Sequence, residues 1–421
     1  MWFFGPVLAV DDHRFWQGAT ARLVTISGLF LLWGLAMVIA GARHSARSKT
    51  DESRADRQHP GLVEDERKQV RARFKDALHT LKTSRHYFGR SVRSRNELPW
   101  YLLIGQRGSG KSALLAANGL QRPPDHLQTA SSGASAYCDW FFADQGVLME
   151  SAGRYLDQPD RAVDAAGWST LLGLLKSRRR VRPLNGVVVT LSVDTLLGSN
   201  EHDLERHARH VHSRLQDIQQ TLHIDIPVYL VLTHADHIPG FTAFFDTPHD
   251  SAAEGVFGEL ITGSHTGVPM AQVRQVFETL LQRLSGELVQ RLHQERNVER
   301  RGWMLGFVPQ VARIGERLCL FIEVAFCAHR NQRIQGLRGF YLTCAGERHE
   351  RFVQGLFNQV IFAEADLAGL HAEEHRRIRW RQAGWASAVA LVIGAAGMLW
   401  VHSYGICPLY TSPRPTDGLQ T

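Results

Sequence analysis

Short apolar runs alternate with longer, periodically apolar segments along the middle of the chain. The apolar runs predict strands that begin at residue 100 and recur at 138–142, 146–150, 186–193, 227–233 and 337–344. Apolar residues at helical spacing predict helices at 64–88, 112–118, 165–176 and 202–222. Strands that alternate with helices are typical of a doubly wound α/β sheet. Residues 250–335 interrupt the alternation with a mostly helical pattern, so we expect a helical insertion there.

Two uninterrupted apolar runs flank this central region. Residues 23–42 and 384–401 carry no charge over a length that suits the hydrocarbon core of a bilayer, and tryptophans lie near both ends of the second run. A cleaved signal peptide is disfavoured for the first run, because the run is long and basic residues follow it. A buried core helix is the alternative for the second. We expect both runs to be transmembrane helices.

The basic residues give the expected orientation. The formal net charge is +7, and arginines and lysines crowd after residue 42 and before residue 384. Because positive flanks stay on the cytosolic side, we expect residues 43–383 to be cytoplasmic. This topology accounts for most basic runs, and we expect no nucleic-acid partner. The run at 176–182 could also be a solvated helix end or contact an anionic membrane leaflet.

A glycine-rich turn joins the first predicted strand to a helix. It fits the phosphate-binding pattern G-x-x-x-x-G-K-[ST] over Gly105, Gln106, Arg107, Gly108, Ser109, Gly110, Lys111 and Ser112. Glycines let backbone N–H groups approach phosphate oxygens, Lys111 would reach the β- and γ-phosphates, and Ser112 would bind Mg²⁺. We therefore expect a site for Mg²⁺ with GTP or ATP. A chance match in a glycine-rich loop is the alternative.

Two later strands end in residues that resemble GTPase elements. The stretch VLMESAGR at 147–154 resembles hhhhDxxG, with Glu150 as the Mg²⁺ acid and Gly153 as the γ-phosphate contact. The stretch THAD at 233–236 resembles the guanine-reading [NT]KxD, with Thr233 and Asp236 in the conserved places and histidine instead of lysine between them. Arg154 stands where Ras-type GTPases carry the glutamine that orients water, so we expect any hydrolysis to be slow.

These features divide the chain into consecutive parts. We expect the remnant of a first membrane span with a short periplasmic loop at 1–22, a transmembrane helix at 23–42, a charged linker and helix at 43–96, a P-loop core at 97–249, the helical insertion at 250–335, the last strand with juxtamembrane helices at 336–383, a transmembrane helix at 384–401 and a short periplasmic tail at 402–421.

Other candidate sites are weaker. The five cysteines lie far apart without a C-x-x-C pair, so neither a zinc knuckle nor a disulfide framework is supported. The stretch HAEEH at 371–375 fits an inverted zincin pattern, but a solvated helical face before a membrane span accounts for it better. The histidines at 207, 210 and 212 are interpreted as titratable residues of a polar helix.

A family resemblance extends over nearly the whole chain. The matching stretches are WFFGPVLA (2–9), LPWYLLIGQRGSGKSALLAANGL (98–120), YCDWFFADQGVLMESAGRYLDQ (137–158), VRPLNGVVVTLSVDTLL (181–197), PVYLVLTHADHIPGFTAFF (227–245), LRGFYLTCAGE (337–347) and FNQVIFAEADLAGL (357–370). In these the chain resembles the N-terminal part of the IcmF/TssM proteins, the inner-membrane components of type VI secretion systems. The CDWFF, SAGRY and RPLNG series is more specific than the phosphate loop alone.

The resemblance implies a multi-pass protein of the bacterial inner membrane with a cytosolic GTPase-like domain. It also implies a DotU/TssL-like inner-membrane partner, other secretion-complex subunits and homo-oligomers within the complex. The chain departs from the family pattern in ESAGRY for DTAGRY and THAD for TKCD, in a mostly missing first span and in a missing periplasmic region. Three hypotheses follow: a scaffold or switch that binds nucleotide, an active NTPase that drives assembly, and a truncated non-functional homologue.

Overall fold

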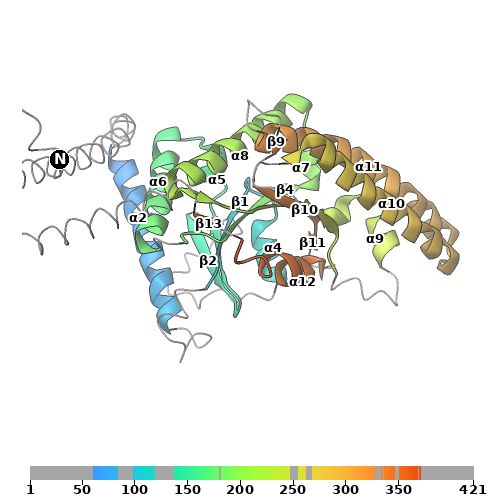
Figure 1. Cartoon of the computed structure of the whole chain (residues 1–421), viewed down its shortest axis with the longest axis horizontal. Helices are drawn as coiled ribbons and strands as arrows, with labels where there is room; N and C mark the ends of the chain where they lie inside the picture. The colour runs from blue at the N-terminus through green and yellow to red at the C-terminus, as the bar shows by residue number, and fades with distance from the viewer. Residues whose placement is uncertain are drawn as a thin grey trace, which may run out of the picture.

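A mostly parallel sheet lies between two layers of helices (Figure 1). The computed structural model describes residues 60–83, 98–118, 137–179, 182–246, 255–261, 268–327, 333–334, 336–346, 350–367 and 369–370. No helix in these ranges is both long and apolar enough to cross a membrane. The two predicted spans, at 23–42 and 384–401, lie outside the described residues.

The main sheet contains seven strands within the described part of the chain. In spatial order they are β2 (Cys138–Phe142), β3 (Val147–Ser151), β1 (Trp100–Ile104), β4 (Gly186–Ser192), β6 (Val228–Thr233), β10 (Leu337–Leu342) and β7 (Gly258–Leu260). The five inner strands are parallel, and β2 and β7 are antiparallel at the two edges. The predicted doubly wound α/β sheet is confirmed as a mixed, parallel-rich sheet.

Helices cover both faces of the sheet. The larger core is formed with α2 (Pro60–Thr83), α5 (Arg154–Asp157), α6 (Arg161–Arg178), α7 (Val193–Gly198), α8 (Glu201–Leu222), α9 (Phe241–Phe245), α10 (Met270–Gln294) and α11 (Val298–Phe326). The smaller core is formed with α4 (Lys111–Ala117), α12 (Val353–Gly355) and η5 (Leu356–Ile361). The remaining short elements are η3 (Ala235–His237) and the strand pairs β5 (Ile224–Asp225) with β13 (Gly369–Leu370), β8 (Val268–Pro269) with β9 (Arg333–Ile334) and β11 (Cys344–Ala345) with β12 (Glu350–Arg351).

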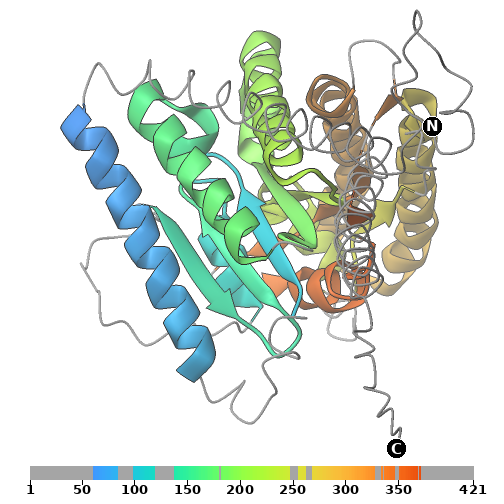
Figure 2. The same ribbon diagram turned by 60° about the vertical axis from the view of Figure 1, so that its left-hand side comes forward.

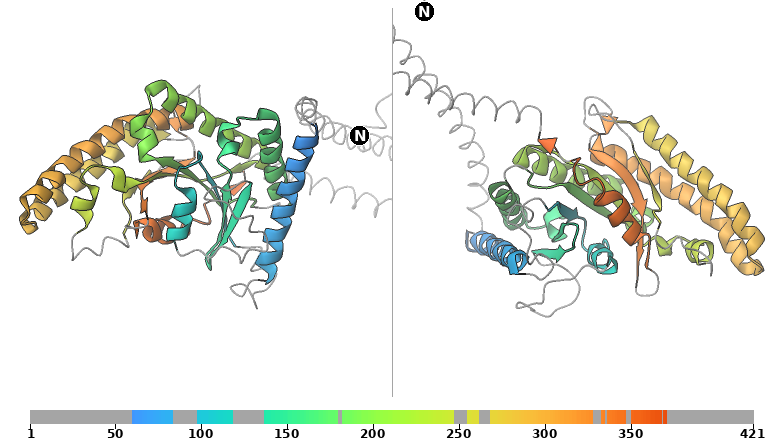
Figure 3. Two further views of the ribbon diagram at one scale, coloured as in Figure 1. Left: turned by 180° about the vertical axis from the view of Figure 1, so that it is seen from behind. Right: turned by 60° about the horizontal axis from the view of Figure 1, so that its bottom comes forward.

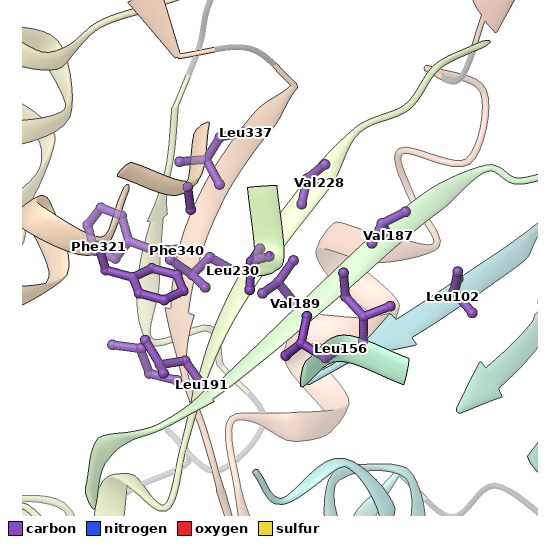
Figure 4. Packing of buried hydrophobic residues seen from close by; sticks show 14 of the residues in the cluster. Leu102, Leu156, Val187, Val189, Leu191, Val228, Leu230, Phe321, Leu337 and Phe340 are labelled. Carbon is purple, nitrogen blue, oxygen red and sulfur yellow. The ribbon is translucent and has the colours of Figure 1, made fainter. Parts of the chain in front are cut away.

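The central strands are buried on both faces, which explains their continuous apolar sequences. In β4, Val187 and Val189 face the larger core, whereas Val188 faces the smaller one. Figure 4 shows side chains of β4, β6 and β10 packing with Phe321 of α11.

Helix α2 packs beside α6 and the edge strand β2, and the α10–α11 pair lies at the opposite end of the sheet (Figures 2 and 3). The apolar spacing that predicted a helix at 64–88 corresponds to the inner face of α2, since Val70, Phe74 and Leu81 are buried and Leu78 is partly buried.

Two expectations need correction. The segment 250–335 contains the helices α10 and α11, but it also contains β7, which pairs with β10 in the main sheet. A three-residue strand is too short to show a period of two, so the pattern missed it. His207 is buried at 4% exposure rather than decorating a polar surface, because it shares the inner face of α8 with Leu204 and Val211. The division of the chain into domains stays a prediction.

Candidate nucleotide-binding site

The carboxyl ends of β1, β3, β4 and β6 meet at one edge of the sheet, because these strands are parallel. The phosphate-binding loop, residues 105–110, follows β1. Glu150 lies near the end of β3, and Thr233 ends β6. Ligands of open α/β sheets bind in the crevice outside such strand ends. The fold therefore places the three sequence elements of the predicted site at a single edge.

The phosphate-binding loop turns back on itself before α4. Gly108 and Gly110 have φ values of 80° and 74°, in the left-handed region that favours glycine. Ser109 between them is buried, and its Oγ lies 2.8 Å from Oγ1 of Thr190 on β4. Gln106 donates from its side chain to Asp157, whereas Arg107 is exposed at the outside of the turn. β4 thus supports the loop at Ser109, whereas Arg107 lies on its exposed side.

Lys111 folds into the curve of the loop. Its Nζ donates to the carbonyl oxygens of Gly105 and Gln106, each at 2.8 Å, and the side chain is only 5% exposed. Burial lowers the pKa of Lys111 to about 8, and the carboxylates of Glu150 and Asp157 oppose this shift. The ammonium group therefore stays mostly protonated at neutral pH, inside the loop where phosphate oxygens would lie.

Ser112 and Glu150 are in direct contact. The Ser112 hydroxyl donates to Glu150 Oε1 at 2.7 Å, although the two residues are far apart in sequence. A hydroxyl and a carboxylate beside a phosphate loop are the oxygen donors that Mg²⁺ prefers. The extra methylene of glutamate, relative to the aspartate of the resembled element, does not prevent this contact. These two residues fit a magnesium ion.

Gly153 packs against the backbone of the phosphate-binding loop. A Cβ atom at this position would lie 2.5 Å from the backbone nitrogen of Arg107 and 2.8 Å from its Cα. Only glycine fits there without moving the loop. The predicted γ-phosphate contact is thus adjacent to the loop in the structure.

Arg154 turns away from the loop. Its guanidinium pairs with Glu66 of α2 at 2.6 Å and with Asp164 of α6 at 2.5 Å. It also lies over the rings of Tyr137 and Tyr155. This side chain is therefore committed to packing α2 onto the core and is not directed to where a phosphate would bind.

The segment after β6 closes the other side of the site. Thr233 Oγ1 donates to the carbonyl oxygen of Ser109 at 2.9 Å, so the predicted base-reading segment contacts the phosphate-binding loop directly. Asp236 lies in the following turn, near Cys344. Its Oδ1 is buried without a hydrogen-bond partner among the described residues. An acceptor left open in this way suits a base edge that presents N–H groups.

His234 occupies the place between Thr233 and Asp236. Its backbone is left-handed, with φ 58°, and its Nδ1 lies 3.1 Å from the Ser192 hydroxyl. Its ring stacks on His237 at a centroid distance of 5.3 Å, and His237 in turn contacts Asp194 at 2.8 Å. The two residues that flank Asp236 in the segment 234–237 thus form a stacked pair of rings.

Several residues around the site were not predicted from sequence. Thr190 supports Ser109 from within a mostly apolar strand, where a polar residue after three valines was the available signal. Asp194, in the first turn of α7, and His237, at the end of η3, belong to no recognisable motif. In the part of the chain that is described, no group of three or more His, Cys, Asp or Glu side chains could hold a metal ion. The H-x-x-E-H pattern at 371–375 lies outside that part.

Comparison with solved structures finds low-scoring matches to GTP- and GDP-bound proteins. A chain of the signal recognition particle receptor SRb-GTP/SRX complex from Chaetomium thermophilum matches with 20% identity and a TM-score of 0.23, over 33% of this chain and 70% of that one. A mutant of NFeoB from S. thermophilus, bound to GDP, matches with 12% identity and a TM-score of 0.23, over 54% of this chain and 98% of that one.

Sequence comparisons are more informative. The model of the IcmF-related N-terminal domain matches residues 161–350. The type VI secretion system component TssM1 of Pseudomonas aeruginosa is 33% identical over 372 residues, which cover 80% of this chain and 34% of the relative. The chain therefore spans about a third of the length of this curated relative. Together, the domain match and this identity show that the chain belongs to the IcmF/TssM family.

Proposed function

We propose that this chain is an inner-membrane component of a type VI secretion complex, whose cytosolic domain binds a nucleotide with Mg²⁺ and acts as a scaffold or switch. The secretion role is supported by the similarity to TssM1. The membrane location rests on the apolar runs at 23–42 and 384–401, which lie outside the described residues.

The contact between Ser112 and Glu150, directly after the loop that encloses Lys111, carries the nucleotide proposal. Lys111 would leave the carbonyl oxygens of Gly105 and Gln106 and move to the β- and γ-phosphates. Ser112 and Glu150 would hold Mg²⁺, which neutralises phosphate charge when bound. Asp236 would accept from a base that presents N–H groups, which guanine does on its Watson–Crick edge. The stacked rings of His234 and His237 do not distinguish guanine from adenine, so affinity measurements decide between GTP and ATP.

Arg154 favours the scaffold or switch over an active NTPase. A working Ras-type GTPase needs a side chain that orients water beside the γ-phosphate, and glutamine supplies it. Here the corresponding side chain is paired with Glu66 and Asp164. We expect slow phosphate release at most. As partners we propose a DotU/TssL-like inner-membrane protein, other secretion-complex subunits and further copies of this chain.

Direct binding tests the proposal. Fluorescent GTP and ATP, with and without Mg²⁺, are titrated into the full chain in detergent. We expect Lys111→Ala to weaken binding at least about tenfold, because it removes a charge-assisted contact to phosphate. Ser112→Ala should remove the part of the affinity that depends on Mg²⁺. Lys75→Ala, which deletes an exposed lysine on α2, is the matched control and should bind as the unmodified chain does. Failure of both nucleotides to bind to folded protein would refute the nucleotide proposal.

A further inference from the structure

Three buried polar side chains and one partly exposed arginine join α2 to the core beside the phosphate-binding loop. We call Glu66, Arg154, Tyr155 and Asp164 the Glu66 cluster. Arg154 pairs with Glu66 at 2.6 Å and with Asp164 at 2.5 Å, and the Tyr155 hydroxyl donates to Glu66 at 2.5 Å. The cluster thus connects three helices: α2, α5 and α6.

The cluster depends on its single arginine. Glu66, Tyr155 and Asp164 are at most 5% exposed, and the two carboxylates share one guanidinium. Glu66 lies in a notch of α6, where a Cβ atom at Gly167 would be 2.7 Å from its Oε1. If Arg154 moved away, two buried carboxylates would lose their cation, and a buried unpaired charge is strongly unfavourable. The N-terminal half of α2 would then leave the core.

The position of Arg154 is linked to the phosphate-binding loop through Gly153, which packs on Arg107. Arg154 directly follows Gly153, and the space between Gly153 and Arg107 is too small even for a methyl group. Phosphate entry requires Lys111 to release the carbonyl oxygens of Gly105 and Gln106, which lie next to Arg107 in the loop. A shift of this segment therefore pushes Gly153 and changes the position of Arg154.

The C-terminal half of α2 is held in a different way. Phe74 packs on the rings of Trp100 and Trp140, at centroid distances of 6.4 and 5.2 Å. Ala77 and Leu81 are buried in the same core. These apolar contacts involve neither Gly153 nor Arg154. The N-terminal half of α2 is thus attached through Arg154, next to the phosphate-binding loop, whereas the attachment of the C-terminal half is independent of that loop.

We infer that nucleotide occupancy of the loop is transmitted through Gly153 and Arg154 to α2, which loosens its N-terminal half while Phe74 serves as the fixed point. This inference rests on the proposed nucleotide site and names the element of the fold that responds when the site is occupied. The output element is the helix that begins at Pro60 and flanks α6 and β2 (Figure 2). Coupling between two sites of a protein typically changes an affinity about 5–150-fold.

Hydrogen exchange of the full chain in detergent tests the inference. Amide exchange is measured by mass spectrometry with no nucleotide, with Mg²⁺ and GTPγS, and with Mg²⁺ and ATPγS. We expect exchange in residues 60–70 to rise about fivefold or more when nucleotide binds, while residues 74–83 stay unchanged. Nucleotide that binds without changing exchange in 60–70 would overturn the inference and leave the proposed function intact. Absence of binding would overturn both.

A matched pair of variants on α2 separates coupling from simple destabilisation. Glu66→Gln weakens the cluster, whereas Glu64→Gln changes an exposed carboxylate two residues away. Because coupling is reciprocal, Glu66→Gln should tighten GTPγS binding by at most the factor by which nucleotide raises exchange in 60–70. Glu64→Gln should leave GTPγS affinity unchanged. A purely structural Glu66 would lower stability without tightening binding, and that result would also overturn the inference.

Discussion

Replacing His207 with leucine should stabilise the protein, and more so in acid. His207 lies between α8 and α11, with its ring against Phe321 at a centroid distance of 5.5 Å. Neither ring nitrogen has a hydrogen-bond partner among the described residues. A buried polar group without a partner costs about 1–3 kcal/mol, and loss of the aromatic contact gives back roughly 0.5–1.5 kcal/mol. We therefore expect His207→Leu to gain about 1 kcal/mol at pH 8, where imidazole is neutral in both states.

The pH dependence follows from the pKa. Burial lowers the pKa of His207 from 6.5 to about 4, with Asp157 opposing the shift and His210 adding to it. The unfolded chain therefore binds this proton first as the pH falls. The titration of His207 therefore costs no folding stability above pH 6.5. Below that pH, the free energy of unfolding falls progressively towards pH 4. The limit is roughly 3 kcal/mol, and linkage gives about 2 kcal/mol already at pH 5. The advantage of His207→Leu should grow to about 3 kcal/mol at pH 5.

Urea denaturation at pH 8 and pH 5, followed by tryptophan fluorescence, measures the difference between the variant and the unmodified chain. Comparing differences removes the contribution of all other titrating groups, because they are common to both proteins. His202→Leu, on the exposed side of the same helix, is the matched control. If the advantage of His207→Leu were the same at both pH values, His207 would have to be solvated or partnered in the native protein, and the reasoning would be refuted.

Two further substitutions test how the core is held together. Asn185→Ala should lower the free energy of unfolding by about 1–3 kcal/mol in urea denaturation. The Asn185 side chain accepts from the backbone N–H of Trp100 and donates to the carbonyl of Ala365, so its loss leaves the buried amide of Trp100 unpaired. Phe74→Ala should lower the free energy of unfolding by about 3–5 kcal/mol in the same measurement, since it removes the ring through which α2 packs on Trp100 and Trp140. A cost below about 0.5 kcal/mol for either would contradict the packing described here.

The strands of the central sheet could be predicted because their burial on both faces leaves a continuous apolar signal. Val187 to Leu191 illustrate this, and the boundaries of β2 agree with the prediction to the residue. β7 could not be predicted, since its three residues acquire their role only from pairing with β10. The helical spacing of His207 from Leu204 and Val211 indicated that it would be buried, but the many polar residues of α8 suggested an exposed helix instead.

The same limit applies to the candidate site. Contacts within one segment, such as those inside the phosphate-binding loop, follow from local sequence. The pairing of Ser112 with Glu150 needed the order of parallel strands, which the motif positions indicated. The pairing of Arg154 with Glu66 could not be inferred, because Glu66 is one of several acidic residues at the start of α2 and only the docked helix distinguishes it from Glu64.

Arg154 bears on the choice between a catalyst and a switch. A side chain that holds two buried carboxylates cannot orient an attacking water at the same time, and withdrawing it to do so would leave Glu66 and Asp164 unpaired. Catalysis through this residue would thus oppose the packing of α2. The coupling that we propose between the loop and α2 requires only that nucleotide binds, without chemistry. The arrangement is consistent with a protein that responds to bound nucleotide rather than one that turns it over rapidly.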